Sequence, residues 1–416
     1  MKKFFIEALG CALRELDAEK IKNWLLSNGL KFTLASGEAD YIIFVICGLN
    51  KERCEDGINR IHAFKKMKGE LIIVGCLPIM HPEMFKKVFS GKTVITKEIE
   101  KIDELFPEFK IKFKDTPDAN RSFVSSATDI IQITRRFTRS SIKLYFDKII
   151  QTLHETGNAL VCGRPLRNVE GLVGGIGFDN AYFSLRISDG CSWSCSYCSM
   201  KKAIGSAKSK PIQTVLEEAK RAVSQKKFKI NIISSDSGSY GLDIGLTLPQ
   251  ILKEILAQDE RIVIEFVQDL NPFFFCKYKN ELVKLIATGR IKSTSVPFQS
   301  GSERILGLMN RRLDFSEFRE TIKEIKKVNP VFKLRTQVII GFPTETDEDF
   351  LKTMELLGDC KFNEVDLFAY YEGDGTVSQT ITPKVSVEVI SRRMNLAKKL
   401  LKATPIRFIS NYQERK

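Results

Sequence analysis

The sequence contains no long apolar run. Apolar stretches such as residues 41–47 end after the length of one strand, whereas a membrane helix needs roughly 18 to 20 apolar residues. The first residues, MKKFFIEALGC, combine lysines, apolar side chains and a cysteine in the manner of a lipoprotein signal, but Glu7 interrupts a stretch already too short for export. We therefore expect a soluble, cytoplasmic protein with no membrane association.

Acidic residues are the minority among the charged ones. The chain has 51 Asp and Glu against 65 Lys and Arg, a formal net charge of +14. An excess of this size favours anionic partners, including nucleic acid, but lysines scattered over solvated helix faces produce it too. Charge alone therefore leaves the partner undecided.

The length of 416 residues exceeds one ordinary domain and predicts two or three packed units. In the second half of the chain, strand-like runs alternate with amphipathic helical stretches. These runs are residues 181–188, 229–235, 261–268, 293–299, 334–342 and 364–371. The alternation predicts an α/β fold, a partial (βα)6 barrel of the TIM type whose strands present their carboxyl ends at one mouth.

A smaller alternation occupies the first hundred residues. Strand-like runs at residues 4–9, 39–46 and 70–75 are each followed by a helical stretch, which predicts a small doubly wound α/β domain with a parallel sheet. The predicted domain plan is an amino-terminal domain at 1–107, a connecting segment at 108–180, the barrel at 181–402 and a carboxyl-terminal tail at 403–416.

Three cysteines, Cys191, Cys195 and Cys198, follow the first predicted barrel strand at spacings of four and three residues. Thiolates in one loop can occupy three irons of a [4Fe–4S] cluster, and because no fourth cysteine follows nearby, one iron stays open for a small chelating ligand. The alternative is a zinc site that lacks one ligand, but zinc sites prefer paired two-residue spacings and a closed fourth position. The pattern therefore indicates a catalytic iron–sulfur cluster.

This loop resembles the signature of the radical S-adenosylmethionine (SAM) superfamily, with Tyr197 as the aromatic residue before the third cysteine. The resemblance implies that SAM chelates the open iron through its amino and carboxylate groups, and that Tyr197 belongs to the cofactor-binding residues. It also implies reductive cleavage of the sulfonium to a 5′-deoxyadenosyl radical, with a flavodoxin- or ferredoxin-type protein as the electron donor. The protein binds and orients these cofactors, which carry the chemistry.

Three further cysteines, Cys11, Cys47 and Cys76, are far apart in sequence, yet each follows the end of a predicted strand. Because parallel strands end along one edge of a sheet, about 4.8 Å apart, these thiols can converge on one site. Taken singly, each is better explained as a core cysteine, but three equivalent positions favour a shared site. The other cysteines show no ligand spacing and are interpreted as small buried thiols: Cys54, Cys162, Cys276 and Cys360.

Nearly the whole chain resembles the radical SAM methylthiotransferases. The resemblance rests on the surroundings of the three amino-terminal cysteines and on the segments VPFQSGSERIL at 296–306, RTQVIIGFPTET at 335–346 and DSGSYGLD at 236–243. It implies that Cys11, Cys47 and Cys76 bind a second [4Fe–4S] cluster, which carries the sulfur that is methylated and inserted.

Several polar residues at predicted strand ends are expected to contact SAM. They are Ser235, Asp236, Gln299, Ser300 and Thr336. Each is explained equally well as a residue that caps a loop.

Some positions depart from the family pattern. Gln337 stands where the family usually has aspartate, and Thr344 where it usually has glycine. Family members that modify tRNA carry an additional small β-barrel for RNA binding, whereas this sequence continues into a basic helix and a short remainder. We therefore expect a monomeric enzyme that modifies a peptide or protein side chain, with tRNA as the alternative substrate.

The expected reaction uses two molecules of SAM. One methylates a sulfur on the second cluster, and the other yields the radical that removes a hydrogen atom from an unactivated C–H bond, after which the carbon radical takes up the methylthio group. A first alternative is a peptide-modifying radical enzyme whose second cluster only transfers electrons. A second alternative is a non-catalytic RNA-binding or redox-sensing protein with structural clusters.

Overall fold

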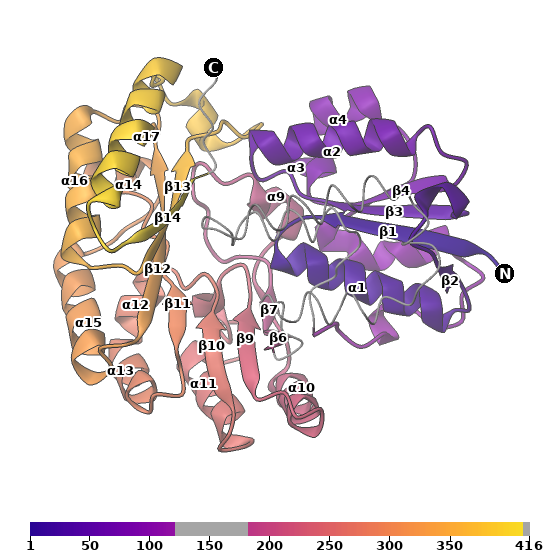
Figure 1. Ribbon diagram of the computed structural model, residues 1–416, viewed down its shortest axis with the longest axis horizontal. Helices are drawn as coiled ribbons and strands as arrows, with labels where there is room; N and C mark the ends of the chain where they lie inside the picture. Colours follow the sequence, from indigo (N-terminus) through magenta and orange to yellow (C-terminus); the bar gives the residue numbers. More distant parts are fainter. Residues whose placement is uncertain (121–181, 411–416) are drawn as a thin grey trace, which may run out of the picture.

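The first unit is a five-stranded parallel sheet with the strand order β2-β1-β3-β4-β5. The computed structural model describes residues 1–120 and 182–410, and Figure 1 shows helices on both faces of this sheet. The strands are β1 (Lys3–Leu9), β2 (Lys31–Phe32), β3 (Tyr41–Ile46), β4 (Glu70–Gly75) and β5 (Thr93–Ile95). The helices are α1 (Ala12–Ser27), α2 (Lys51–Phe64), α3 (Leu77–Met80) and α4 (Pro82–Val88), with 3-10 helices η1 (Ser36–Glu38), η2 (Thr96–Leu105) and η3 (Phe113–Asp115). The predicted doubly wound fold is confirmed, and β2 and β5 are additions too short to leave an apolar pattern.

The central strand β3 shows why this sheet is stable. Residues 42–46 are all buried, an unbroken apolar run that suits a parallel strand covered on both faces. Ile43 packs in one core with Trp24 of α1, whereas Phe44 packs in a second core with Ile61 of α2. The sheet is therefore held between two apolar layers, which fixes the edge where its strands end.

The strand order of the first sheet reverses direction between β1 and β3. Strand β2 lies on one side of β1, and β3, β4 and β5 follow on the other. In open α/β sheets such a switch point leaves a crevice at the carboxyl ends of the strands, where ligands bind. Cys11 follows β1 and Cys47 follows β3, so both residues border this crevice.

The second unit is a seven-stranded parallel sheet with the order β14-β13-β12-β11-β10-β9-β6, and helices cover its outer side (Figure 1). Its strands are β6 (Tyr182–Arg186), β9 (Lys229–Ile233), β10 (Val263–Val267), β11 (Ser293–Ser295), β12 (Lys333–Ile340), β13 (Glu364–Ala369) and β14 (Arg407–Ser410), and β7 (Ser188–Asp189) and β8 (Lys208–Ser209) form a separate antiparallel pair. Its helices are α9 (Met200–Ile204), α10 (Ile212–Ser224), α11 (Leu248–Ala257), α12 (Pro272–Lys277), α13 (Lys279–Ala287), α14 (Glu303–Leu308), α15 (Phe315–Val328), α16 (Asp347–Asp359) and α17 (Val387–Lys402), with 3-10 helices η4 (Ser237–Ser239) and η5 (Val377–Thr380). All six predicted strands are present. Within the described ranges β6 and β14 do not pair with each other, so the barrel is open.

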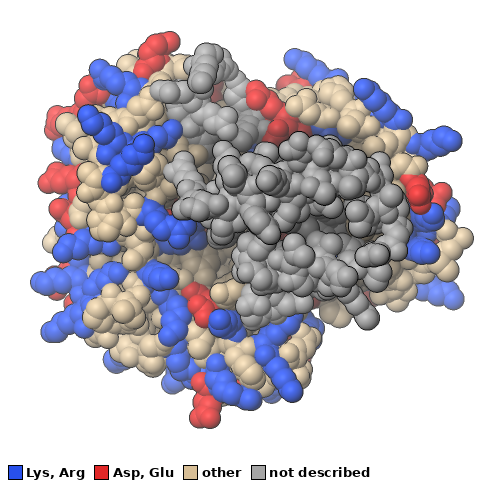
Figure 2. All heavy atoms as spheres, viewed as in Figure 1, with Lys and Arg blue, Asp and Glu red and all other residues tan. Residues whose placement is uncertain are grey.

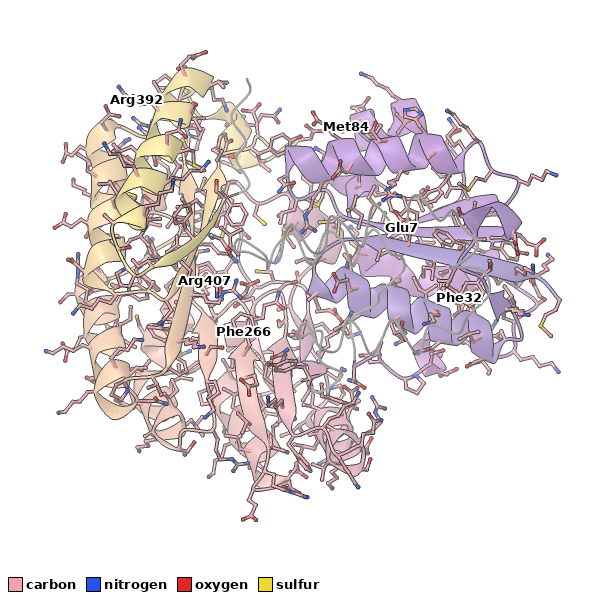
Figure 3. The ribbon with its side chains drawn as sticks, in the orientation of Figure 1. Glu7, Phe32, Met84, Phe266, Arg392 and Arg407 are labelled. Atoms are coloured by element: carbon pink, nitrogen blue, oxygen red, sulfur yellow. The ribbon has the colours of Figure 1, made fainter. Side chains whose placement is uncertain are left out.

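The segment predicted as a tail contains the seventh strand. Strand β14 pairs in parallel with β13, and its Arg407, labelled in Figure 3, lies 3.9 Å from the Glu364 carboxylate. The strand has only four residues, and every second one is exposed. Such a short segment has too few apolar residues to show a strand pattern in the sequence. Most of the predicted connecting segment, with Cys162, and residues 411–416 lie outside the described ranges. No helix in the described ranges is both long and apolar enough to cross a membrane.

The inner side of the barrel is polar. In β12, Leu334 is buried in the core beneath the helices, whereas Arg335 and Gln337 on the opposite face are partly exposed. Arg335 pairs with Glu364 of β13 and lies 5.4 Å from the ring centre of Phe266 on β10 (Figure 3). A closed TIM barrel fills this space with branched apolar side chains. The open barrel instead offers an interior that suits a polar ligand.

Gly75 ends β4 immediately before Cys76, and its φ of +134° favours glycine. A Cβ atom at this position would lie 2.2 Å from the Ile46 carbonyl oxygen on the neighbouring strand. We expect Gly75→Ala to destabilise the first unit by about 3 kcal/mol or more, because it combines backbone strain with a clash against backbone. Unfolding followed by Trp24 fluorescence in a Trp193→Phe background measures this loss.

Gly29→Ala is the matched control in the same unit. Gly29 also has a positive φ, +86°, but a Cβ atom there would meet no atom within 4 Å. Only the strain of about 1–2 kcal/mol is expected. Equal destabilisation by the two substitutions would show that the contact with Ile46 is not what requires glycine at position 75.

Candidate functional site: two cysteine triads between the units

The register of the first sheet brings three cysteines to one edge. Leu9 pairs with Ile46, which pairs with the last residue of β4, so the three strands end at the same level. Cys47 donates its backbone N–H to the Leu9 carbonyl at 3.0 Å, and Cys76 donates to the Ile46 carbonyl at 2.8 Å. Cys11, Cys47 and Cys76 form what we call the amino-terminal triad, in which Cys11 lies close enough to contribute to the raised pKa of both Cys47 and Cys76.

Two thiols of the amino-terminal triad are buried. Burial, reinforced by the neighbouring Cys11 and Cys76, raises the pKa of Cys47 to about 12. Burial also raises the pKa of Cys76, whereas Arg14 and the Thr96 hydroxyl, 3.2 Å from the Cys76 sulfur, act in the opposite direction. Because a metal binds the thiolate form, binding at these residues is coupled to release of their protons.

Cys191, Cys195 and Cys198, which we call the barrel triad, lie in the loop between β7 and α9. Cys198 donates its backbone N–H to the Cys195 carbonyl at 3.1 Å, which tightens the loop. Asn310, just after α14, donates to the Ser194 carbonyl at 2.8 Å. Burial raises the pKa of Cys191 to about 12 and also raises the pKa of Cys198. Contacts from distant parts of the barrel therefore hold this loop in place.

Each triad supplies three thiols, one for each of three irons in the expected cubane cluster. No group of three or more His, Cys, Asp or Glu in residues 1–120 and 182–410 is arranged to hold one metal ion. In a tetrahedral zinc site the sulfurs lie about 3.8 Å apart, whereas in a [4Fe–4S] cluster each thiolate binds a different iron and the sulfurs are more widely separated.

Arg311 lies against the barrel triad, and sequence reasoning missed it. Its Nη1 is 3.7 Å from the Cys195 sulfur and 3.4 Å from the Tyr197 hydroxyl, and its Nη2 donates to the Pro297 carbonyl at 2.6 Å. Tyr197 itself packs against the apolar cluster that contains Phe342. No spacing in the sequence links Arg311 to the cysteines, because only the path of the chain after α14 brings them together.

Three of the predicted SAM-contacting residues present buried polar atoms without a partner. Ser235 Oγ, Asp236 Oδ1 and Gln299 Oε1 have no hydrogen bond within the described residues. The other carboxylate oxygen of Asp236 accepts from Ser192 of the cysteine loop at 2.9 Å. Buried polar atoms are normally hydrogen-bonded, so these three oxygens indicate a place for a polar ligand.

Ser300 and Thr336 use their hydroxyls within the protein. Thr336 Oγ1 donates to the Val296 carbonyl at 2.8 Å, and Ser300 Oγ accepts from the Ser302 backbone N–H at 3.2 Å. These contacts agree with a loop-fixing role, which the sequence left open. Contact of these two residues with SAM stays a prediction.

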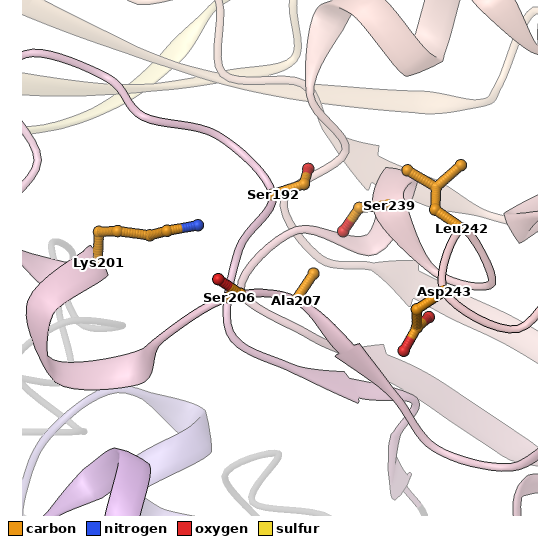
Figure 4. A pocket seen from close by; sticks show the side chains of 7 residues that line it. All are labelled: Ser192, Lys201, Ser206, Ala207, Ser239, Leu242 and Asp243. Atoms are coloured by element: carbon orange, nitrogen blue, oxygen red, sulfur yellow. The ribbon is translucent and has the colours of Figure 1, made fainter.

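A pocket of about 310 Å³ opens beside the cysteine loop (Figure 4). It is lined by Ser192, Lys201, Ser206, Ala207, Ser239, Leu242 and Asp243. Lys201, which lines the pocket, donates to the Cys191 carbonyl, so the pocket lies directly beside the barrel triad.

Asp269 is a second residue that sequence reasoning missed. It follows β10 and accepts from the Gln337 amide at 3.3 Å on the polar side of the barrel. Burial raises the pKa of Asp269 to about 6, Asp366 raises it too, and a hydrogen bond from Gln268 acts in the opposite direction. An aspartate at position 337, the usual residue of the family, would face Asp269. The amide at position 337 therefore avoids adding another carboxylate beside Asp269 and Asp366.

The two triads lie where the units meet. Helix α3 follows Cys76 and helix α9 follows the barrel triad, and Cys76, Met80 and Ala203 form one buried apolar cluster. Arg186 of β6 donates to Asp17 of α1 at 2.7 Å, and Figure 1 shows α9 between the two sheets.

Comparison with known proteins agrees with this division. Residues 185–357 match the radical SAM superfamily, and residues 3–96 match the uncharacterized protein family UPF0004. The chain is 28% identical over 405 residues to the ribosomal protein uS12 methylthiotransferase RimO of Geotalea uraniireducens (strain Rf4), covering 94% of this chain and 80% of the relative. It is 26% identical over 379 residues to a probable threonylcarbamoyladenosine tRNA methylthiotransferase of Pyrococcus abyssi (strain GE5 / Orsay), covering 91% and 79%. The solved radical SAM methyltransferase TsrM of Kitasatospora setae shares the fold, with a TM-score of 0.60 at 13% identity over 91% of this chain and 77% of that one.

An open parallel barrel with three cysteines in the loop after its first strand defines a radical SAM enzyme. The first sheet also matches, and methylthiotransferase relatives cover nearly the whole chain, so the chain is a homologue of the radical SAM methylthiotransferases over 94% of its length. Its cofactors are therefore [4Fe–4S] clusters and SAM.

The raised pKa of Asp269 predicts a pH-dependent gain in stability for Asp269→Asn. The fold favours the protonated carboxyl, so the cost of ionisation is fully present above pH 6 and disappears as the pH falls toward the ordinary value of 3.8. We expect the variant to be more stable than the parent at pH 8, by up to about 3 kcal/mol, and the gain to shrink by pH 5. Thermal unfolding of the metal-free proteins at both pH values measures it.

Asp259→Asn is the control, because the pKa of Asp259 is shifted in the opposite direction to that of Asp269. Hydrogen bonds from Arg261 lower the pKa of Asp259 to about 2, so removing that carboxylate should not stabilise the protein at pH 8. A gain for Asp269→Asn that is equal at pH 5 and pH 8 would contradict the assignment.

Proposed function

We propose that this enzyme inserts a methylthio group at an unactivated C–H bond of a peptide or protein side chain, with one [4Fe–4S] cluster on each cysteine triad. The proposal is supported above all by the packing of Cys76 in the same apolar cluster as Ala203 of α9, the helix that begins two residues after Cys198. Two sulfur-ligated sites that share one interface can act on one substrate.

Bound at these sites, the cofactors supply reductive cleavage of SAM at the barrel triad and a methylated sulfur at the amino-terminal triad. The chain positions them. Ser235, Asp236 and Gln299 offer their unpartnered oxygens to the polar groups of SAM. Trp193, in the cysteine loop, packs edge-on against Phe273 at 5.6 Å and against Phe274 at 5.8 Å, which fixes one side of the loop.

Acidic side chains in the barrel interior favour a peptide over a nucleic acid. Asp366 lies on the face of β13 opposite the buried Val365, and Asp269 lies nearby, whereas Glu364 on the same face is paired with Arg335. Carboxylates repel phosphates but accept hydrogen bonds from peptide N–H groups and cationic side chains.

The distribution of positive charge also favours a peptide over a nucleic acid as substrate. Figure 2 shows Lys and Arg spread over the visible face with acidic residues between them, rather than gathered in one stripe. Nucleic-acid-binding proteins usually cluster these residues. The relatives carry names for both substrates, a ribosomal protein and a tRNA, so tRNA stays the second candidate.

Iron content tests the two-cluster assignment. We expect about eight irons per chain after anaerobic reconstitution, because two cubanes hold four irons each. Cys47→Ala and Cys195→Ala should each reduce the content to about four. Cys276→Ala, which removes a buried cysteine of the barrel core, is the matched control and should retain about eight. A parent protein with about four irons would refute the second cluster.

Product mass tests the reaction and the substrate class. The reconstituted enzyme is incubated with SAM, dithionite and either ribosomal protein uS12 or unmodified tRNA as probes. We expect 5′-deoxyadenosine and a gain of about 46 Da on the protein probe, which is the replacement of hydrogen by a methylthio group. A gain on the tRNA alone would contradict the peptide assignment, and a loss of about 2 Da would indicate a crosslinking enzyme whose second cluster only transfers electrons.

A further inference from the structure

A buried row of charged side chains runs from the amino-terminal triad to the first barrel strand. Arg14 Nη1 donates toward the Cys76 sulfur at 3.7 Å, and Arg14 Nη2 lies 3.0 Å from one oxygen of Asp17. The other oxygen of Asp17 accepts from Arg186 Nη2 at 2.7 Å. The side chains of Arg14, Asp17 and Arg186 are only 3%, 5% and 11% exposed, so solvent ions screen these charges little.

Within the described residues, positive charge exceeds negative charge along this row. Arg14 and Arg186 share the single carboxylate of Asp17. The other acidic groups near Arg186 are Asp189, which is 3.4 Å away and 58% exposed, and Asp118, which also pairs with Lys20 and Lys210. Arg14 Nε, moreover, has no hydrogen-bond partner within the described residues. Because an uncompensated buried charge is strongly destabilising, the positive charge beside Cys76 requires an anion there.

Arg14 lies at a position in α1, the first turn, where the helix dipole disfavours a positive charge. A Cβ atom at Gly10 would come within 2.4 Å of the Arg14 Cβ, so the glycine leaves the space that Arg14 occupies. Within the helix this cation pairs with Asp17, which it shares with Arg186, and outside the helix its neighbour is the Cys76 sulfur.

We propose that Arg14 is a positioning residue for the iron–sulfur cluster of the amino-terminal triad, where its guanidinium donates an N–H···S hydrogen bond to the Cys76 thiolate and raises the reduction potential of the cluster. This inference rests on the proposed function, because it requires a cluster at that triad. Hydrogen bonds to sulfur and nearby positive charge favour the reduced state, which carries one more negative charge. Asp17 weakens this effect, because its carboxylate neutralises part of the charge on Arg14.

The midpoint potential of the amino-terminal cluster tests the proposal. The full chain with Cys191→Ala, Cys195→Ala and Cys198→Ala leaves only that cluster, which is reconstituted anaerobically and titrated by electron paramagnetic resonance. We expect Arg14→Gln to disfavour reduction by roughly tenfold, a shift of about 59 mV to more negative potential for one electron. Asp17→Asn should shift the potential in the opposite direction, an effect that a purely structural role would not produce.

Lys101→Gln is the matched control, because Lys101 carries the same charge in the same unit but is exposed and pairs with Glu98 rather than with a cysteine. It should leave the potential unchanged. Arg14→Lys keeps the positive charge and should shift the midpoint potential less than Arg14→Gln, in the same negative direction. This variant provides the test if Arg14→Gln does not fold. Potentials that do not move in the Arg14 and Asp17 variants would overturn this proposal alone, whereas a parent without iron in this background would refute the cluster at the amino-terminal triad itself.

Discussion

The parallel register of β1, β3 and β4 is the constraint on which the amino-terminal triad depends. Each strand ends at the same level, so the residue after β3 and the residue after β4 reach the same edge as Cys11. A slip of one residue would turn Cys47 toward the opposite face, because side chains alternate along a strand. The apolar layers on both faces prevent such a slip, since Ile43 and Phe44 would exchange their cores. The fold thus determines the distance between the sulfurs before any metal is considered.

Burial of the thiols links this geometry to chemistry. A thiol with a pKa near 12 is a poor ligand until a metal displaces its proton, so metal binding must supply the free energy of deprotonation. Each triad has an arginine whose Nη1 lies 3.7 Å from one sulfur, the buried Arg14 beside Cys76 and the partly buried Arg311 beside Cys195. The Arg14 guanidinium lowers the pKa of Cys76 and so opposes the effect of burial, and Arg311 places a positive charge beside Cys195. The two sites therefore share one feature, an arginine beside a cysteine sulfur, although they lie in different units of the fold.

The open barrel serves the site through its polar interior. Seven strands leave a gap between β6 and β14, and the inner face carries charged and amide side chains in place of an apolar filling. Asp269 and Gln337 illustrate this interior. The Gln337 side-chain amide donates a hydrogen bond to the Asp269 carboxyl, whereas an aspartate at position 337 would repel it. The first unit joins the barrel at the helices that follow the cysteines and through the ion pair of Asp17 with Arg186.

The sequence by itself determined the features that arise from neighbouring residues. The spacing of the barrel triad is local, and the long apolar runs mark buried strands, so the cysteine loop, both α/β units and the strand-end positions of the other cysteines could be predicted. Only the tertiary structure decided which polar atoms are left without partners, as for Gln299 in contrast to Thr336, because a hydrogen bond depends on groups far away in the chain. It also placed Arg14, Arg311 and the short strand β14, since a buried cation and a four-residue edge strand leave no periodic signal in the sequence.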